Sequence, residues 1–231
     1  KTKNIIWLKT DISKIENKIN KVIKFAPSII IHLAWDGIPI LNKKNSEKSL
    51  KDSVIFFSKI CKHTKINKII CLGSCLEYKY KNGLKSEKEN IDNKNYFSKS
   101  KNELRKYIDK ISSKNKISYA WLRVFYIYGM GQREGSLINF ILNFIKKNKK
   151  KLKFKNPYIK NDYIYIDDFN KLVLKIIKKK FKSGIFNVGT YVKSMFELAE
   201  KTKPDVKQGN IEKGSGVWKL RTNYYRNDIL E

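Results

Sequence analysis

The chain has 231 residues, and its 51 Lys and Arg against 21 Asp and Glu give a formal net charge of +30. A hydrophobic content of 41% is enough to build a core, which argues against a disordered chain. No apolar run approaches 18 residues, and Lys1–Trp7 lacks the apolar region of a signal peptide, so we expect a cytoplasmic protein without a membrane segment. Three Cys and two His argue against a disulfide scaffold or a structural zinc site, and no metal is expected.

The positive charge has two interpretations. Only five of the basic residues are Arg, whose forks nucleic-acid recognition usually employs. The lysines are scattered, and their clusters at 146–151 and 178–180 fall at predicted helix ends, where Lys interacts favourably with the terminal carbonyls. We interpret the charge as solvated surface and expect no nucleic-acid partner. The alternative is a non-catalytic protein that binds RNA or another polyanion through this surface.

Strands and helices alternate along the chain. Residues 79–95 are polar and predict a loop, and no pattern is assignable after Lys201. The alternation is typical of an α/β fold with a doubly wound parallel sheet and right-handed crossovers. In chain order, apolar runs and helical spacing predict a strand at 4–9, a helix at 12–25, strands at 28–33 and 68–73 separated by a helix at 47–63, a helix at 96–113, a strand at 118–126, a helix at 136–147, a strand at 162–166, a helix at 168–180 capped by Asp168, a strand at 184–188 and a helix starting at Met195.

Ligands of such sheets bind beyond the carboxyl ends of the strands. The residues that directly follow each predicted strand are therefore the candidates for a site. They are Asp11, His32 to Trp35, Gly73 to Cys75, Phe125 and Tyr126, and Asn187 to Gly189.

These strand ends resemble, in the same order, those of the extended short-chain dehydrogenase/reductase family of NAD(P)-dependent nucleotide-sugar epimerases, dehydratases and ketoreductases. The resemblance runs from about residue 4 to residue 200. It implies a Rossmann-like sheet whose first strand here corresponds to the family's third, so that the chain looks N-terminally truncated and lacks the glycine-rich GxxGxxG segment. The similar segments are 10–12 (TDI), 30–34 (IIHLA), 71–78 (CLGSCLEY), 121–129 (WLRVFYIYG), 161–168 (NDYIYIDD) and 184–189 (GIFNVG).

The resemblance also implies domains, partners and site residues. Residues 1–130 would form a partial dinucleotide-binding Rossmann domain, and 131–231 a substrate-binding part interleaved with the last sheet elements. The implied partners are a nucleotide-linked sugar, NAD or NADP as cofactor, and a second copy in a homodimer formed by the helices at 47–63 and 96–113. The implied site residues are Ser74, Tyr96 and Lys101 for catalysis, Asp11, Ile12, Leu33, Ala34, Trp35 and Lys101 for the cofactor, and Cys75, Tyr126 and Asn187 for the substrate.

The tyrosine and the lysine depart from the family's Tyr-x-x-x-Lys spacing, which places an ammonium one helical turn from a phenol and lowers the phenol's pKa. Four residues after Tyr96 stands Ser100, and four residues before Lys101 stands Phe97. Three interpretations remain. Tyr96 reaches Lys101 from an irregular helix start, which we favour; Lys99 replaces Lys101; or the acid/base has been lost.

The serine loop narrows the implied reaction. The family's 4,6-dehydratases carry an Asp-Glu pair after the Ser or Thr, whereas Cys75 and Leu76 occupy these places here. We therefore expect a 4-epimerase or 4-ketoreductase that transfers a hydride between nicotinamide and C4 of the sugar. His32, within an apolar strand, is expected to be a core or cofactor-adjacent residue. The sequence indicates neither the sugar nor the nucleotide.

Overall fold

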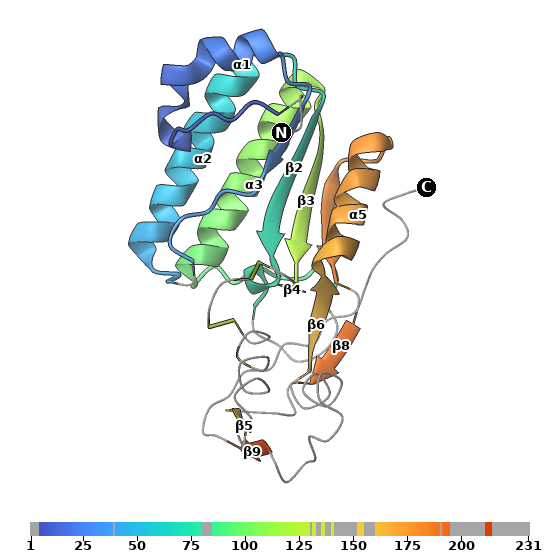
Figure 1. Ribbon diagram of the computed structural model, residues 1–231. Helices are drawn as coiled ribbons and strands as arrows, with labels where there is room; N and C mark the ends of the chain where they lie inside the picture. The colour runs from blue at the N-terminus through green and yellow to red at the C-terminus, as the bar shows by residue number, and fades with distance from the viewer. Residues whose placement is uncertain are drawn as a thin grey trace. The chain divides into compact units, whose positions relative to one another are not determined.

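The computed structural model describes residues 5–38, 40–79, 85–129, 131–132, 135–136, 140, 152–154, 160–189, 191–194 and 211–213 (Figure 1). The chain divides into two compact units. Unit 1 comprises residues 1–77, 91–122 and 182–185, and unit 2 comprises 78–90, 123–181 and 186–231. The chain passes from one unit to the other several times, so these units differ from a single cut at residue 130. The functional assignment of the two predicted domains stays a prediction.

The main sheet has the strand order β1-β2-β3-β7. β1 is parallel to β2, with Ile29 opposite Lys68, and the arrows of β2 and β3 point the same way in Figure 1. All four strands lie where the sequence predicts strands. The strand predicted at 118–126 corresponds to β3, which ends at Val124, and only its last residue, Tyr126, belongs to the strand that follows. The bounds are β1 (Ile29–His32), β2 (Lys68–Ser74), β3 (Ser118–Val124) and β7 (Gly184–Val188).

Helices of unit 1 pack on its part of the sheet. The three helical segments predicted in this unit, at 12–25, 47–63 and 96–113, are all present. The predicted helix at 12–25 is a 3-10 helix, η1 (Ile12–Lys18), followed by α1 (Ile19–Phe25), with non-helical backbone angles at Lys14. α2 (Lys43–His63) begins four residues before its predicted start, because the Asn42 side chain caps it by accepting from an amide 2.9 Å away. α3 (Tyr96–Asn115) is capped by Asn95 in the same way.

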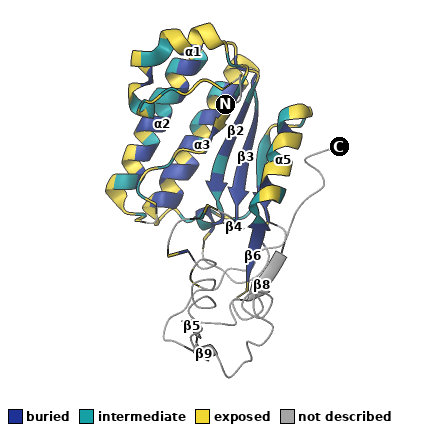
Figure 2. Cartoon of the chain, in the orientation of Figure 1, coloured by how far each residue is buried: buried dark blue, intermediate teal, exposed yellow. Residues whose placement is uncertain are grey.

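The core of unit 1 lies between these helices and the sheet. Apolar side chains of the helices face those of β2 and β3, and Figure 2 shows buried stripes on α2 and α3 with exposed residues on their outer sides. This pattern is the one that amphipathic helices produce when they cover a sheet. Fully buried members of the core include Phe57, Ile60, Ile69, Cys71, Leu104, Ile108 and Trp121.

Unit 2 contains a smaller sheet with the order β4-β6-β8. β4 (Tyr126–Tyr128) is parallel to β6 (Lys160–Tyr165), and β8 (Tyr191–Ser194) is antiparallel to β6. α5 (Ile166–Lys178) follows β6 directly and buries Phe169, Leu172 and Ile176. β5 (Leu152–Phe154) pairs with β9 (Ile211–Lys213). The sequence predicted none of β5, β8 and β9.

Two predictions about these elements are wrong. The strand predicted at 4–9 does not form over its described residues, 5–9: Ile6 and Trp7 are exposed, and no described strand runs beside them to complete a hydrogen-bonded ladder. Asp168 is not an N-cap, because α5 starts two residues earlier with Tyr165 at the cap position, and Asp168 instead pairs with Lys171 at 3.2 Å.

The predicted helices at 136–147 and from Met195 fall almost entirely outside the described residues. Within the described part of the chain, no helix combines the length and the apolar character needed to cross a membrane.

Candidate functional site

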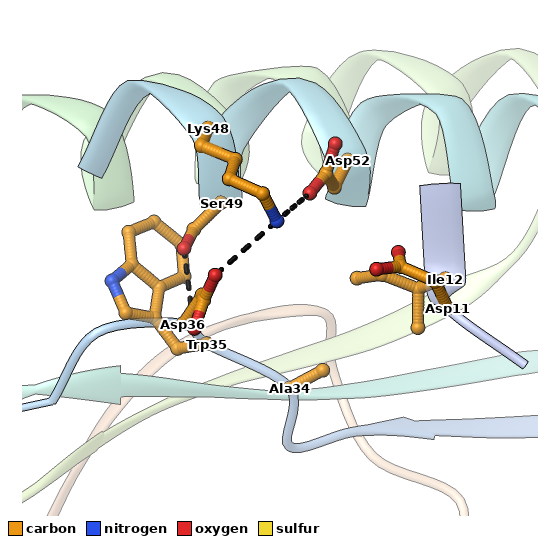
Figure 3. A pocket seen from close by; sticks show the side chains of 8 residues that line it. All are labelled: Asp11, Ile12, Ala34, Trp35, Asp36, Lys48, Ser49 and Asp52. Carbon is orange, nitrogen blue, oxygen red and sulfur yellow. Dashed lines mark hydrogen bonds and ion pairs between the residues drawn. The ribbon is translucent and has the colours of Figure 1, made fainter. Parts of the chain in front are cut away.

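A cavity of about 380 Å³ lies at the carboxyl end of β1 in unit 1 (Figure 3). Four of the residues predicted to bind the cofactor line it together, with Trp35 at one end and Asp11 and Ile12 at the other. Leu33, also predicted, is 60% exposed and is not part of the lining. The full lining is Asp11, Ile12, Ala34, Trp35, Asp36, Lys48, Ser49 and Asp52.

Charged side chains form one wall of this cavity. The Lys48 ammonium lies 2.8 Å from the Asp52 carboxylate and 3.2 Å from that of Asp36 (Figure 3). Hydrogen bonds to Asp52 and then to Asp36 raise the pKa of Lys48 above its ordinary 10.5. At the other end, Asp11 caps η1 by accepting from the Ser13 amide at 2.9 Å and its hydroxyl at 2.7 Å, which lowers the pKa of Asp11. The cavity therefore has aspartate side chains at both ends.

Lys101 is the most deeply buried of the predicted catalytic groups. Its side chain comes from α3, and its Nζ donates to the Leu72 carbonyl at 2.8 Å near the carboxyl end of β2. The same Nζ lies 3.9 Å from the centre of the Trp35 ring, so one indole lines the cavity and also covers the ammonium. Burial lowers the pKa of Lys101 to about 8, although Glu77 and then Cys71 oppose this fall.

Ser74 ends β2 and is held from both its backbone and its side chain. Its amide donates to Glu77 Oε1 at 2.8 Å, and its Oγ accepts from the Leu76 amide at 3.2 Å. The next residue, Cys75, begins the 3-10 helix η2 (Cys75–Glu77) and is buried, although the sequence predicts a substrate contact there.

Phe97, rather than Tyr96, is the aromatic residue beside Lys101. α3 starts regularly at Tyr96, because Asn95 accepts from the amides of the next turn. Tyr96 is therefore 49% exposed, with the Lys43 ammonium 5.9 Å from its ring centre. Phe97 is buried, meets Trp35 edge-on at 5.6 Å, and lies 5.8 Å from Lys101 Nζ. The irregular helix start that would carry Tyr96 toward Lys101 is not present.

In unit 2, the predicted substrate residue Asn187 is buried in a hydrogen-bond network. Its Oδ1 accepts from the Tyr78 hydroxyl at 2.5 Å, its Nδ2 donates to the Lys85 carbonyl at 2.9 Å, and its backbone amide donates to Glu87 at 2.9 Å. Tyr126, by contrast, is 39% exposed and contacts the Tyr163 ring at 5.6 Å. Of the two predicted substrate residues in this unit, only Tyr126 offers an accessible side chain.

Arg123 completes that network. Its guanidinium lies 4.5 Å from the Tyr78 ring centre and donates to the Glu87 carbonyl at 3.1 Å. Burial raises the pKa of Tyr78 to about 12, so this phenol stays protonated and acts as a hydrogen-bond donor. Sequence reasoning missed these contacts, because the partners lie more than 30 residues apart in the chain.

The remaining titratable candidates are core groups. His32 packs against the Phe57 ring at 5.0 Å, and burial, followed by the Lys101 charge, lowers its pKa to about 4. It is a neutral core residue, as expected. Burial also raises the pKa of Cys61 to about 11 and that of Cys71 further, so neither thiol is a nucleophile at neutral pH. The described residues contain no group of three or more His, Cys, Asp or Glu side chains that could hold a metal ion.

Known proteins resemble this chain in sequence and in fold. An ADP-L-glycero-D-manno-heptose-6-epimerase from Brachyspira hyodysenteriae is 28% identical over 161 residues, which cover 66% of this chain and 51% of that protein. The chain thus spans about half the length of this curated relative.

Solved structures share the fold at low sequence identity. A dTDP-glucose 4,6-dehydratase double mutant from Streptomyces venezuelae with NAD bound superposes with a TM-score of 0.80 at 12% identity, covering 99% of this chain and 73% of that one. A UDP-N-acetylglucosamine 4-epimerase from Bacillus cereus superposes with a TM-score of 0.77 at 19% identity, covering 97% and 81%. The predicted Rossmann-like parallel sheet with flanking helices is therefore confirmed.

Residues 1–189 match the model of a protein family, and this range includes the cavity, Ser74 and Lys101. The predicted resemblance is confirmed, and the chain belongs to the NAD dependent epimerase/dehydratase family.

Proposed function

We propose that this chain carries the catalytic region of an NAD(P)-dependent nucleotide-sugar 4-epimerase or 4-ketoreductase, which transfers a hydride at C4 of the sugar. One observation in unit 1 carries the proposal. Trp35 lines the cavity and also covers the ammonium of Lys101, so the cavity and this lysine lie side by side. Family membership and the NAD-bound dehydratase of the same fold support the choice of cofactor.

The residues of the cavity fit an adenosine-like part of a dinucleotide. Ile12, Ala34 and Trp35 offer apolar and aromatic surface for a base, and the Asp11 carboxylate offers an acceptor for amine or hydroxyl protons. When bound, the nicotinamide supplies the hydride chemistry. The protein residues then have to orient the sugar and move one proton.

Ser74 and Lys101 have hydrogen-bonding capacity left for ligands. Ser74 Oγ accepts from a backbone amide, so its hydroxyl proton is available for the sugar 4-oxygen. Lys101 donates one proton to Leu72, and two N–H groups remain for the hydroxyls of the nicotinamide ribose. We assign the proton exchange with the sugar 4-oxygen to Tyr96, whose half-exposed phenol lies in the first turn of the same helix.

An epimerase or reductase fits the loop after Ser74 better than a dehydratase does. Water elimination needs an acid and a base next to the serine, and the buried Cys75 and the apolar Leu76 provide no carboxyl group. The substrate contact expected of Tyr126, which belongs to unit 2, stays a prediction. A homodimer formed through α2 and α3 stays a prediction.

The test is turnover of nucleotide sugars by the polypeptide that carries this chain. UDP- and dTDP-linked hexoses are incubated with NAD or NADP, and formation of the C4 epimer or reduced sugar is followed by NMR together with absorbance of the reduced cofactor. We expect Tyr96→Phe to lower kcat by about 100-fold or more, because general acid–base catalysis typically contributes that much. Tyr107→Phe, a tyrosine elsewhere on α3, should leave kcat unchanged. Dinucleotide binding without any conversion would contradict the proposal.

A second candidate is a family member that binds the dinucleotide and a nucleotide sugar without transferring a hydride. The observation that favours it is Phe97, which occupies the buried position one turn before Lys101 and carries no hydroxyl. In that case Tyr96→Phe would change neither binding nor any residual activity.

A further inference from the structure

A buried carboxylate that the proposed reaction does not use lies directly behind Ser74. Glu77 is fully buried, and its Oε1 accepts from the Ser74 amide at 2.8 Å. Both of its carboxylate oxygens lie 3.1 Å from Nε1 of Trp121, which donates from β3. A Cβ atom on Gly73 would overlap this carboxylate and this indole, so glycine leaves the space that the pair fills.

The backbone of Glu77 is tied to the helix that carries Lys101. Its carbonyl accepts from the Ser98 hydroxyl at 2.7 Å and from the Asp92 amide at 2.8 Å. One residue therefore links the end of β2, the strand β3 and the first turn of α3.

Lys101 needs a compensating charge at this place. Its ammonium is buried, and its nearest partners are the neutral Leu72 carbonyl and the aromatic rings of Trp35, Phe97 and Trp121. A buried ammonium without an opposite charge is costly, and it loses its proton when nothing compensates it. The centre of the Trp121 ring is 6.0 Å from Lys101 Nζ, and the same indole holds Glu77.

We propose that Glu77 is a positioning residue of this site, whose buried carboxylate fixes the Ser74 amide and supplies the negative charge that compensates the Lys101 ammonium. The effect of Glu77 on catalysis rests on the proposed function. Its contacts with Ser74 and Trp121 lie within unit 1 and do not depend on that function.

Other titratable groups around Lys101 are weaker candidates for this role. Cys71 of β2 also favours the charged lysine, but the pKa of its buried thiol is raised, so it is neutral at working pH. His32 of β1 is kept neutral by burial and by the Lys101 charge itself. Glu77 is therefore the carboxylate in this surrounding that favours the protonated form of Lys101.

The experiment compares Glu77→Gln with Glu103→Gln in the polypeptide that carries this chain. Glutamine keeps the size of the side chain and its carbonyl can still accept from the Ser74 amide, so the variant removes mainly the charge. The titration of Lys101 Nζ is followed by NMR, and the pH dependence of kcat is measured beside it. We expect Glu77→Gln to lower the Lys101 midpoint by about one pH unit, as a buried charge several ångströms away would do, and to shift the basic limb of the kcat profile in the same direction. Glu103→Gln removes an exposed carboxylate on α3 and should move neither.

An unchanged Lys101 midpoint in a folded Glu77→Gln variant would overturn the inference, whether or not the protein turns over a sugar. A shifted midpoint in a protein without hydride transfer would uphold the electrostatic role while the proposed function fails.

If Glu77→Gln folds too poorly for NMR, a double-mutant cycle with Lys101→Met uses urea midpoints instead. If the two charges compensate each other, the double variant should lose less free energy of unfolding than the sum of the two single variants. Additive losses would overturn the inference.

Discussion

Acid should unfold this protein in part through one buried histidine. His32 is 5% exposed, and its Nε2 has no hydrogen-bond partner among the described residues. Burial lowers its pKa from 6.5 to about 4. Between these two pH values the unfolded chain therefore binds a proton at His32, whereas the folded chain does not. At about 1.4 kcal/mol per pH unit, His32 contributes about 3 kcal/mol of stability that is present above pH 6.5 and lost as the pH falls to 4.

The perturbation is His32→Phe, which keeps an aromatic ring against Phe56 and Phe57 and removes the titrating group. The free energy of unfolding is measured in urea at pH 7 and at pH 4 for the parent and the variant. Any misfit of the new ring costs the same at both pH values, so the variant should gain about 3 kcal/mol relative to the parent between them. His63→Gln, at the exposed second histidine of the chain, serves as the matched control for the loss of an imidazole. An equal difference at both pH values for His32→Phe would refute the argument.

Three further predictions concern stability. Gly73→Ala should lower the free energy of unfolding by about 1–3 kcal/mol through overpacking in a thermal or urea melt, while Gly184→Ala, where a Cβ would meet nothing within 4 Å, should be close to neutral. Asn187→Leu should cost about 2–5 kcal/mol by the same measurement, because the Tyr78 hydroxyl and the Lys85 carbonyl lose their hydrogen-bond partner. Lys48→Met should cost at most about 1 kcal/mol, since the Lys48 side chain is 49% exposed, and a larger loss in double-mutant cycles with its two carboxylates would contradict this.

The sequence predicted the elements of unit 1 because their signals are local. The apolar runs of β1 and β2 predict buried strands. The apolar residues at helical spacing in α2 and α3 predict helices and also indicate which face of each helix is buried. The prediction of a strand at residues 4–9 is wrong for the opposite reason. Their apolar composition permits a strand, but a strand forms only where a neighbour completes its hydrogen bonds, and the local sequence does not state whether one is present.

The site was predictable where it depends on strand ends and was missed where it depends on partners distant in sequence. The end of β1 brings Ala34 and Trp35 to the cavity, and the strand pattern alone selects these two residues. Asp11 was selected as the end of a strand that does not form, and it lines the cavity as the N-cap of η1. Glu77 looks like an ordinary loop residue until β3 supplies Trp121, 44 residues later. Asn187 follows the pattern of a ligand residue, yet its side chain is used for a contact 109 residues away.

The contrast between Tyr96 and Phe97 can be decided by exchanging the hydroxyl. Phe97→Tyr places a phenol one turn before Lys101, in a ring that already lies 5.8 Å from its Nζ and packs on Trp35. If the acid/base has been lost, this variant should gain hydride transfer that the parent lacks, because the ammonium can then lower the pKa of the new phenol. If Tyr96 already exchanges the proton, Phe97→Tyr should change kcat by less than about tenfold, and only Tyr96→Phe should lower it by about 100-fold or more. The double variant Tyr96→Phe/Phe97→Tyr separates the two cases: activity in it assigns the reaction to the buried position, and inactivity assigns it to the exposed one, provided that urea midpoints show each variant folded. The outcome matters beyond one hydroxyl, since a helix cap at Asn95 that starts α3 regularly is what turns Tyr96 outward and Phe97 inward.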